Sequence, residues 1–260
     1  MEDTDTDIVV EDAGGVRWIT IDRPDDGNMF RTRTCLELVE AFREFRTSPD
    51  LGVAVLTGAG DRFFCIGGQK EASDRYDQSV VLPIVDLYEL IDVTAKPIIA
   101  MVNGFAVGGG NVLHLVCDLS IAAEEAAFRQ VGPIVGSFDA GYGTWLLEDA
   151  IGRRRAKEMW FLNKKYTAAA ALEMGLVNEV VPRAELRARV AEVADALLDR
   201  GPQALAALKT AFSSRHTGVA GQARMAHDLL LTQYRHTEES AELQRSFNAR
   251  TAPDRGRFNR

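Results

Sequence analysis

Two glycine clusters stand where the backbone could hold a developing negative charge. Gly108, Gly109 and Gly110 follow an apolar, β-branched run at 97–102 and open an amphipathic stretch. Gly67 and Gly68 end another such segment earlier in the chain. Glycine lets the backbone approach a ligand closely, and the first N–H groups of a helix have no partner within it. The two bends therefore predict a pair of amide donors for one oxygen, the arrangement found in oxyanion holes.

A glycine-rich loop at 128–143 carries a single carboxylate, Asp139. A carboxylate beside a reacting group can act as a general base, although an aspartate in this position also caps helices. Ser137 is not expected to act as a nucleophile, because no histidine stands at the spacing of a nucleophile's base. His114 falls within the central helix and is expected to be structural.

Hydrophobic periodicity predicts the elements that position these residues. Alternating or continuous apolar runs predict strands at 16–21, 53–57, 97–102, 119–122 and 179–182. Helical spacing predicts helices at 34–45, 80–93, from 144, at 153–162 and at 168–174. A polar segment at 70–79 is expected to be a loop beside the site, and everything after residue 184 is expected to be helical. The chain is thus predicted to be α/β with an all-helical end.

Composition narrows the class of protein. A chain of 260 residues with 46% hydrophobic content can bury a full core. The net charge of −8 argues against nucleic acid or an anionic membrane as the main partner. Three widely spaced cysteines predict buried thiols in a reducing compartment, and no metal site is expected. The acidic start lacks an apolar signal core, so a cytoplasmic protein is the expectation.

The two glycine bends resemble those of the crotonase (enoyl-CoA hydratase/isomerase) superfamily, and the resemblance extends over nearly the whole chain. It implies a crotonase spiral of β-β-α units in residues 1–200 and a C-terminal helical trimerisation region in residues 201–260. It also implies an acyl-CoA thioester substrate whose carbonyl oxygen accepts from the N–H groups of Gly68 and Gly109. Coenzyme A enters as part of the substrate, no cofactor is tightly bound, and the assembly is a homotrimer or a hexamer.

Hydratases of this superfamily usually carry one glutamate just after the three glycines and a second in a Gln-Pro-Glu segment. Here the matching stretches read Gly-Asn-Val at 110–112 and Gln-Val-Gly at 130–132. A simple hydratase is not expected, because adding water to a double bond needs such groups. The pattern at 132–143 and Glu-Met-Trp-Phe at 158–161 resemble two other groups. These are 2-ketocyclohexanecarboxyl-CoA hydrolase, which opens a ring, and 1,4-dihydroxy-2-naphthoyl-CoA synthase, which closes one by Dieckmann condensation.

Local residues favour the ring-opening hydrolase, notably Val131 where the synthases usually have threonine. In that route water activated by Asp139 attacks the ring ketone, and cleavage of the C–C bond leaves a thioester enolate in the oxyanion hole. In the ring-closing alternative, a bicarbonate held near Gln130, Gly132 and Trp160 supplies the base that the missing glutamates would provide. A catalytically inactive scaffold with the crotonase fold is a third alternative.

The resemblance assigns roles to further residues. The catalytic set comprises Asp139, Gly68, Gly109, Ser137 and Tyr234. Contacts to substrate or coenzyme A are expected from Arg31, Cys65, Gly67, Lys70, Tyr76, Gln130, Gly132, Trp160 and Arg250. Two departures from both sister groups leave the substrate open to a polycyclic compound or a β-diketone. Gln69 replaces their usual aspartate, and Arg235 occupies the gapless match to their tyrosine, one residue after Tyr234.

Overall fold

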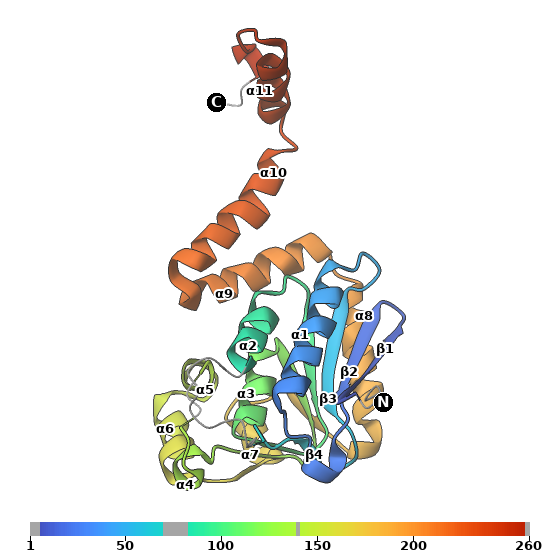
Figure 1. Ribbon diagram of the computed structural model, residues 1–260, viewed down its shortest axis with the longest axis vertical. Coiled ribbons are helices and arrows are strands. Elements are labelled where there is room, and N and C mark those ends of the chain that lie inside the picture. Colours follow the sequence, from blue (N-terminus) through green and yellow to red (C-terminus); the bar gives the residue numbers. More distant parts are fainter. Residues whose placement is uncertain (1–5, 70–82, 139–140, 258–260) are drawn as a thin grey trace. The chain divides into compact units, whose positions relative to one another are not determined.

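The computed structural model describes residues 6–69, 83–138 and 141–257 (Figure 1). The chain divides into two compact units, Met1–Pro202 and Gln203–Arg260. Within the described residues, no helix combines the length and the apolar character needed to cross a membrane.

A six-stranded sheet forms the centre of the first unit, with its strands in the order β1-β2-β3-β5-β7-β10. β1 pairs antiparallel with β2, and the other neighbours are parallel. The strands are β1 (Ile8–Ala13), β2 (Val16–Ile21), β3 (Val53–Gly58), β5 (Ile98–Val102), β7 (Leu119–Ala123) and β10 (Glu179–Val181).

A smaller sheet has the strand order β4-β6-β8-β9. It consists of β4 (Phe63–Cys65), β6 (Phe105–Val107), β8 (Ala127–Arg129) and β9 (Tyr166–Thr167). Each of β4, β6 and β8 directly follows a strand of the larger sheet, and helices come next in the chain. Three successive β-β-α turns result, so the expected α/β spiral is confirmed.

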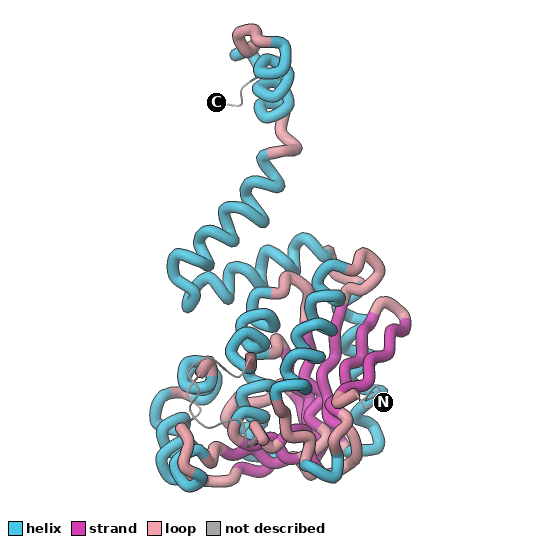
Figure 2. The backbone as a smooth tube through the Cα atoms, in the orientation of Figure 1, coloured by secondary structure: helices cyan, strands magenta, loops and turns pink. Residues whose placement is uncertain are grey.

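Helices cover both faces of the larger sheet (Figure 2). The helices of the first unit are α1 (Thr32–Thr47), α2 (Ile84–Val93), α3 (Gly109–Val116), α4 (Gly132–Val135), α5 (Gly143–Ile151), α6 (Arg153–Leu162), α7 (Ala168–Glu173) and α8 (Arg183–Leu198), with a 3-10 turn at Pro24–Asp26. Alternate residues of each parallel strand enter different cores. In β3, Ala54 and Leu56 pack in the main core, whereas Val53 and Val55 pack in a smaller one that includes Val190 of α8.

The second unit is helical throughout its described residues, as expected. α9 (Pro202–Arg224) continues through a π-helix (Met225–Leu231) into α10 (Thr232–Tyr234), and α11 (Glu238–Ala249) precedes a 3-10 turn at Arg255–Arg257. Gly218 has φ 56° and ψ −130°, a conformation that favours glycine, and it kinks α9. The role of residues 201–260 in trimerisation stays a prediction.

The sequence pattern missed several strands. β1 was not predicted because five of its six side chains are partly or fully exposed, so its apolar pattern is weak. The strands of the smaller sheet have at most three residues, which is too short for periodicity to detect. All predicted strands of the larger sheet occur, with ends shifted by at most about one residue.

Candidate active site

The two glycine bends lie side by side at the carboxyl ends of β4 and β6. Gly67 has φ 101° and Gly108 has φ 56° with ψ −124°, and L side chains rarely adopt either conformation. A Cβ atom built on Gly67 would lie 3.3 Å from the Gly109 nitrogen and 4.0 Å from the Gly108 Cα. The sequence separates the bends, and the smaller sheet brings them together through the parallel pairing of β4 with β6.

The orientation of the Gly68 amide follows from its neighbours. The Phe30 N–H donates to the Gly67 carbonyl (3.0 Å), and the Gln69 N–H donates to the Phe30 carbonyl (2.9 Å). Gly68 is thus the middle residue of a parallel bridge with Phe30. Adjacent peptide groups of an extended chain point in opposite directions, so the Gly68 N–H faces away from Phe30. Gly68 is exposed, which leaves that amide accessible to a ligand.

The Gly109 amide is the first of helix α3, whose N-terminus carries the positive end of the helix dipole. Within the described part of the chain, neither the Gly68 nor the Gly109 amide donates a hydrogen bond to a backbone carbonyl. Both glycines lie against the same Phe30 ring, because a Cβ on Gly109 would meet it at 2.5 Å and one on Gly68 at 3.1 Å. Both amides thus lie beside the same ring, and their joint action as donors to one oxygen stays a prediction.

A buried tyrosine of α2 also packs against the Gly109 bend. The Tyr88 hydroxyl donates to the Gly109 carbonyl at 3.1 Å, and its ring packs edge-to-face with Tyr142. A Cβ on Gly141 would contact the Tyr88 ring at 3.7 Å. The loop that leads into α5 therefore returns to the glycine bends. Asp139 itself lies outside the described residues, as do Lys70 and Tyr76.

Asn111 lies in the stretch at 110–112 just after the glycine bend, and its side chain points into the protein. Asn111 is buried, with its Oδ1 3.0 Å from the Nε2 of His114 and its Nδ2 3.7 Å from the Met159 sulfur. The other ring nitrogen of His114 lies 3.0 Å from the Ser120 hydroxyl. Burial lowers the pKa of His114 to about 3, so the ring is neutral at physiological pH. This group packs the helix and offers no general base.

A second polar group is buried where β8 meets α6. The side-chain Oε1 and Nε2 of Gln130 and the indole Nε1 of Trp160 have no hydrogen-bond partner among the described residues. Asn163 Nδ2 donates to the carbonyl oxygens of both residues at 3.1 Å, which holds their backbones together. Burying unpaired polar atoms costs free energy, so these three atoms are candidates to bind a small polar ligand.

The other predicted residues are placed as follows. Arg31 forms two hydrogen bonds with the Asp7 carboxylate, at 2.8 and 2.7 Å. Cys65 is buried, and its sulfur accepts from the Gly67 N–H at 3.5 Å. Gly132 is buried and its carbonyl accepts from the N–H of the exposed Ser137. In the second unit, the Tyr234 hydroxyl donates to Glu239 at 3.2 Å, and the exposed Arg250 ends α11.

Sequence reasoning missed Phe30, Tyr88, Arg23 and Asp7. The signal for Arg23 is its position before Pro24 at the end of a strand, where the chain turns toward the site. Phe30 and Tyr88 have no signal beyond an apolar pattern, because their role depends on contacts with glycines distant in sequence.

Comparisons with known proteins agree with this geometry. The family model described as Enoyl-CoA hydratase/isomerase matches residues 11–254. A solved enoyl-CoA hydratase from Bacillus anthracis is 30% identical, with 96% of this chain and 98% of that chain covered and a TM-score of 0.78. An enoyl-CoA hydratase subunit I from Geobacillus kaustophilus is 28% identical over 98% of both chains, with a TM-score of 0.77. DspI from Pseudomonas aeruginosa is 25% identical over 88% of this chain and 94% of its own, with a TM-score of 0.77.

Proposed function

The chain belongs to the enoyl-CoA hydratase/isomerase family, and from this premise we propose that it cleaves a C–C bond in a cyclic β-keto acyl-CoA. The observation that carries the proposal is the pair of amides of Gly68 and Gly109 against the Phe30 ring. Donors aimed at a thioester oxygen stabilise the enolate that leaves when the ring opens. The stretches at 110–112 and 130–132 contain no carboxylate, which argues against simple hydration, although two of the similar structures are enoyl-CoA hydratases.

In this mechanism Asp139 accepts a proton from the attacking water. The oxygen adds to the ring ketone, the bond between that carbon and the α-carbon breaks, and its electron pair becomes the thioester enolate. Protonation of the α-carbon then gives the ring-opened acid. Gly141, two residues beyond Asp139, lies against Tyr88, which bonds the Gly109 carbonyl, and this placement supports the assignment. Ser137 and Tyr234 would orient the ketone and the carboxylate.

Ring closure is the second candidate, and the unpartnered atoms of Gln130 and Trp160 favour it. Those groups fit a bicarbonate ion, which Gln130 Nε2 and Trp160 Nε1 could donate to, with Gly132 alongside. The ion would supply the base that removes the α-proton before condensation. Because ring opening and ring closure share the enolate, the same oxyanion hole serves both directions.

The deciding experiment incubates the protein with three thioesters and measures the products by mass. Ring opening adds one water to 2-ketocyclohexanecarboxyl-CoA, ring closure removes one from O-succinylbenzoyl-CoA, and hydration adds one to crotonyl-CoA. Turnover of the first alone supports the proposal, and turnover of the second alone replaces it with the synthase. Turnover of crotonyl-CoA alone overturns both. If none of the three thioesters is turned over and none binds more tightly than acetate, the protein is an inactive scaffold with the crotonase fold.

Coenzyme A contacts belong to the same proposal. Arg31, Lys70, Tyr76 and Arg250 would bind its phosphates and adenine, while Cys65 and Gly67 would line the thioester. Burial of the Asp7 carboxyl by itself raises its pKa, but hydrogen bonds from Arg31 and Thr34 and the charges of Arg31 and Arg23 lower it overall. Arg31 is therefore held in a fixed position, with its side chain 34% exposed.

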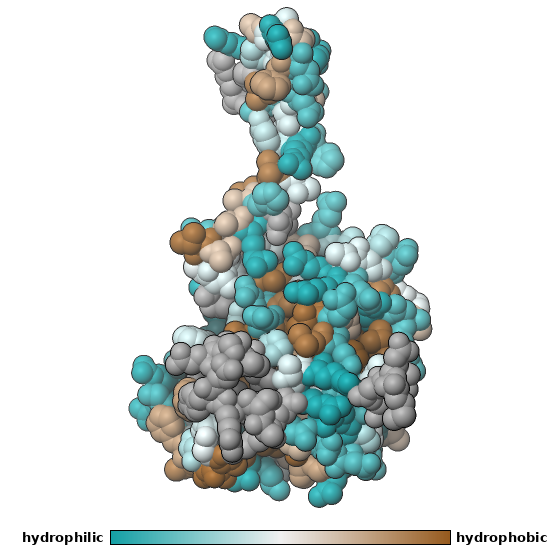
Figure 3. Space-filling model, in the orientation of Figure 1, coloured by the Kyte–Doolittle hydropathy of each residue, from teal (hydrophilic) through white to brown (hydrophobic). Residues whose placement is uncertain are grey.

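We also propose a homotrimer or hexamer in the cytoplasm. The described surface of α4 to α6 carries six exposed large apolar side chains, which are Ile134, Val135, Phe138, Trp145, Phe161 and Leu162. Figure 3 shows apolar atoms on the surface over α4 and α6. Monomers rarely expose such a group together, which supports an interface between copies of this chain. Sedimentation of the wild-type protein and of Phe161→Glu tests it, because the charge should dissociate the assembly into monomers.

A further inference from the structure

The Gly68 amide depends on a short ladder between two loops. The Ile66 N–H donates to the Gly27 carbonyl at 3.2 Å, one step before the two bonds that join Phe30 to Gly67 and Gln69. These bonds fix the register of residues 27–30 beside residues 66–69. Gly68 has no side chain, so the direction of its amide is set by this ladder and by whatever keeps the ladder closed.

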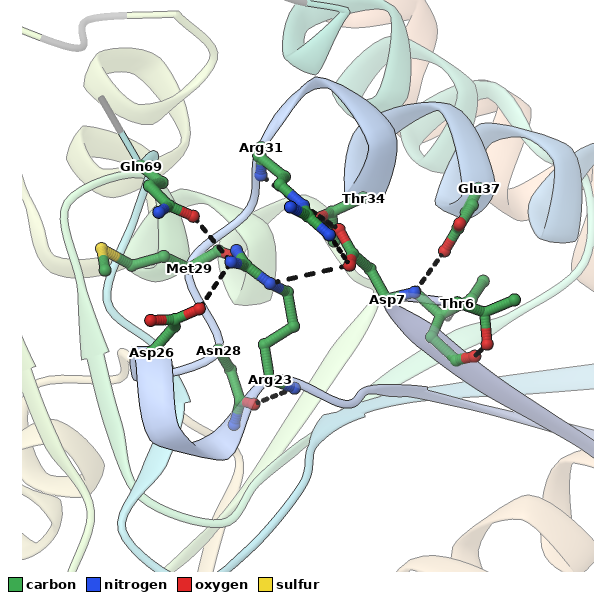
Figure 4. Close-up of polar contacts among 11 residues, drawn as sticks. Thr6, Asp7, Arg23, Asp26, Asn28, Met29, Arg31, Thr34, Glu37 and Gln69 are labelled. Atoms are coloured by element: carbon green, nitrogen blue, oxygen red, sulfur yellow. Dashed lines mark hydrogen bonds and ion pairs between the residues drawn. The ribbon is translucent and has the colours of Figure 1, made fainter. Parts of the chain in front are cut away.

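A single guanidinium ties the two sides of the ladder together (Figure 4). Arg23 Nη1 donates to the Met29 carbonyl, and Arg23 Nη2 donates to Gln69 Oε1 at 2.7 Å. Met29 precedes Phe30 and Gln69 follows Gly68, so the contacts clamp the bridge from both strands. The Arg23 side chain is only 8% exposed, and its Nη2 also bonds Asp26 at 2.6 Å.

Other groups hold Arg23 in place. Its Nε lies 3.7 Å from the Asp7 carboxylate, which also accepts from the Thr34 hydroxyl at 2.6 Å. The Arg23 backbone N–H donates to Asn28 Oδ1 at 3.0 Å. A buried arginine with both ends fixed is pre-organised, since little side-chain entropy remains to be lost on substrate binding.

We propose that Arg23 and Gln69 form a positioning pair that holds the Gly68 amide toward the thioester oxygen. This inference rests on the proposed function. Gln69 stands where the two sister groups usually have an aspartate. Its longer side chain reaches the guanidinium with a neutral oxygen. Displacing an oxyanion donor by a fraction of an ångström weakens stabilisation of the charge that develops in the reaction, while ground-state binding changes little.

The test uses acetoacetyl-CoA, a β-keto thioester whose enolate is detected by its ultraviolet absorbance. Bound to the wild-type protein, the ligand should form its enolate at a lower pH than in solution. Gln69→Met keeps the size but loses the acceptor, and it should raise the apparent pKa of the bound enol by about one unit, a tenfold lower enolate fraction. The dissociation constant should change less than about threefold.

Gln69→Glu restores the acceptor and its charge is matched by Arg23, so the enolate fraction should return to within about threefold of wild type. Gln203→Met is the matched control on the surface and should behave as wild type. Melting temperatures confirm that each variant is folded. The inference is overturned if Gln69→Met titrates like the wild type, or if Gln69→Glu loses as much enolate as Gln69→Met. A wild-type protein that leaves the enol pKa at its solution value instead overturns the proposed function itself.

Discussion

The two glycine bends are proposed to supply two amide donors, and the protein fixes them by different means. The Gly109 amide belongs to a buried helix start, where the Phe30 ring and Tyr88 leave no room for a side chain on Gly109 and the Cys65 backbone leaves none on Gly110. The Gly68 amide belongs to an exposed bridge held by backbone bonds and by the charged group around Arg23. One donor is therefore set by close packing and the other by electrostatics, so substitutions and pH should affect them differently.

The largest effect on enolate formation is expected from Gly109→Ala. The added methyl would lie 2.5 Å from the buried Phe30 ring and 3.2 Å from the Tyr88 hydroxyl. Overpacking should lower the free energy of unfolding by about 2 kcal/mol. Movement of Phe30 should also displace the Gly68 amide, so formation of the acetoacetyl-CoA enolate should fall about a hundredfold. Denaturant unfolding and enolate absorbance measure the two effects, and unchanged enolate formation would show that Phe30 does not couple the bends.

Asp7→Asn should act mainly on stability. Asp7 is buried and bonds Arg31 and Thr34, so replacing its carboxylate with a neutral amide weakens these buried, charge-assisted contacts and should cost about 3 kcal/mol of unfolding free energy at neutral pH. The pKa of Asp7 is lowered from 3.8, so its contribution is complete above about pH 4 and is lost as the pH falls through the lowered value. Denaturant unfolding across this range should show the wild type and variant converging in acid.

Asp26→Asn is the matched control for Asp7. Asp26 also bonds Arg23, but its side chain is 51% exposed, so solvent screens the pair and the loss should stay below about 1 kcal/mol. Equal losses of unfolding free energy in the two variants would show that burial does not make the contacts of Asp7 stronger than those of Asp26.

His114, buried in helix α3 beside the Gly109 bend, should make the free energy of unfolding depend on pH. Burial lowers the pKa of His114 to about 3 in the folded protein from 6.5 in the unfolded chain, so the contribution of the neutral ring to stability is complete above pH 6.5. Below that pH the unfolding free energy should fall by about 1.4 kcal/mol per pH unit until pH 3. Denaturant unfolding between pH 6.5 and 5 should show this slope in the wild type and not in His114→Gln, with His236→Gln as the exposed control.

The smallest effect is expected from Gly68→Ala. A methyl there would lie 3.1 Å from the edge of the Phe30 ring on an exposed bridge, so a small shift relieves the contact. The backbone amide is retained, and enolate formation should fall less than about tenfold, with an unchanged melting temperature. A loss as large as that of Gly109→Ala would mean that both bends are fixed by packing.

Much of the larger sheet could be predicted from sequence because its parallel strands are buried on both faces and read as apolar runs, as at 53–57 and 97–102. Helices α1 and α6 followed from their spacing, with α6 matching the predicted 153–162. The smaller sheet could not be predicted, since strands such as β6 consist of three residues and depend on pairing with β4 and β8. The predicted role of Asp139 stays a prediction.

The sequence by itself determined that two glycine bends follow apolar strands and that no carboxylate stands at 110–112 or 130–132, because residue identity and local spacing are visible without a fold. The tertiary structure alone decided that the bends meet on one Phe30 ring and that Arg23 reaches Gln69. It also decided that Asn111 turns inward to His114 and that Gln130 and Trp160 are buried without partners among the described residues. The reason is that hydrogen bonds and burial join residues far apart in the chain, and no local pattern records which of them will meet.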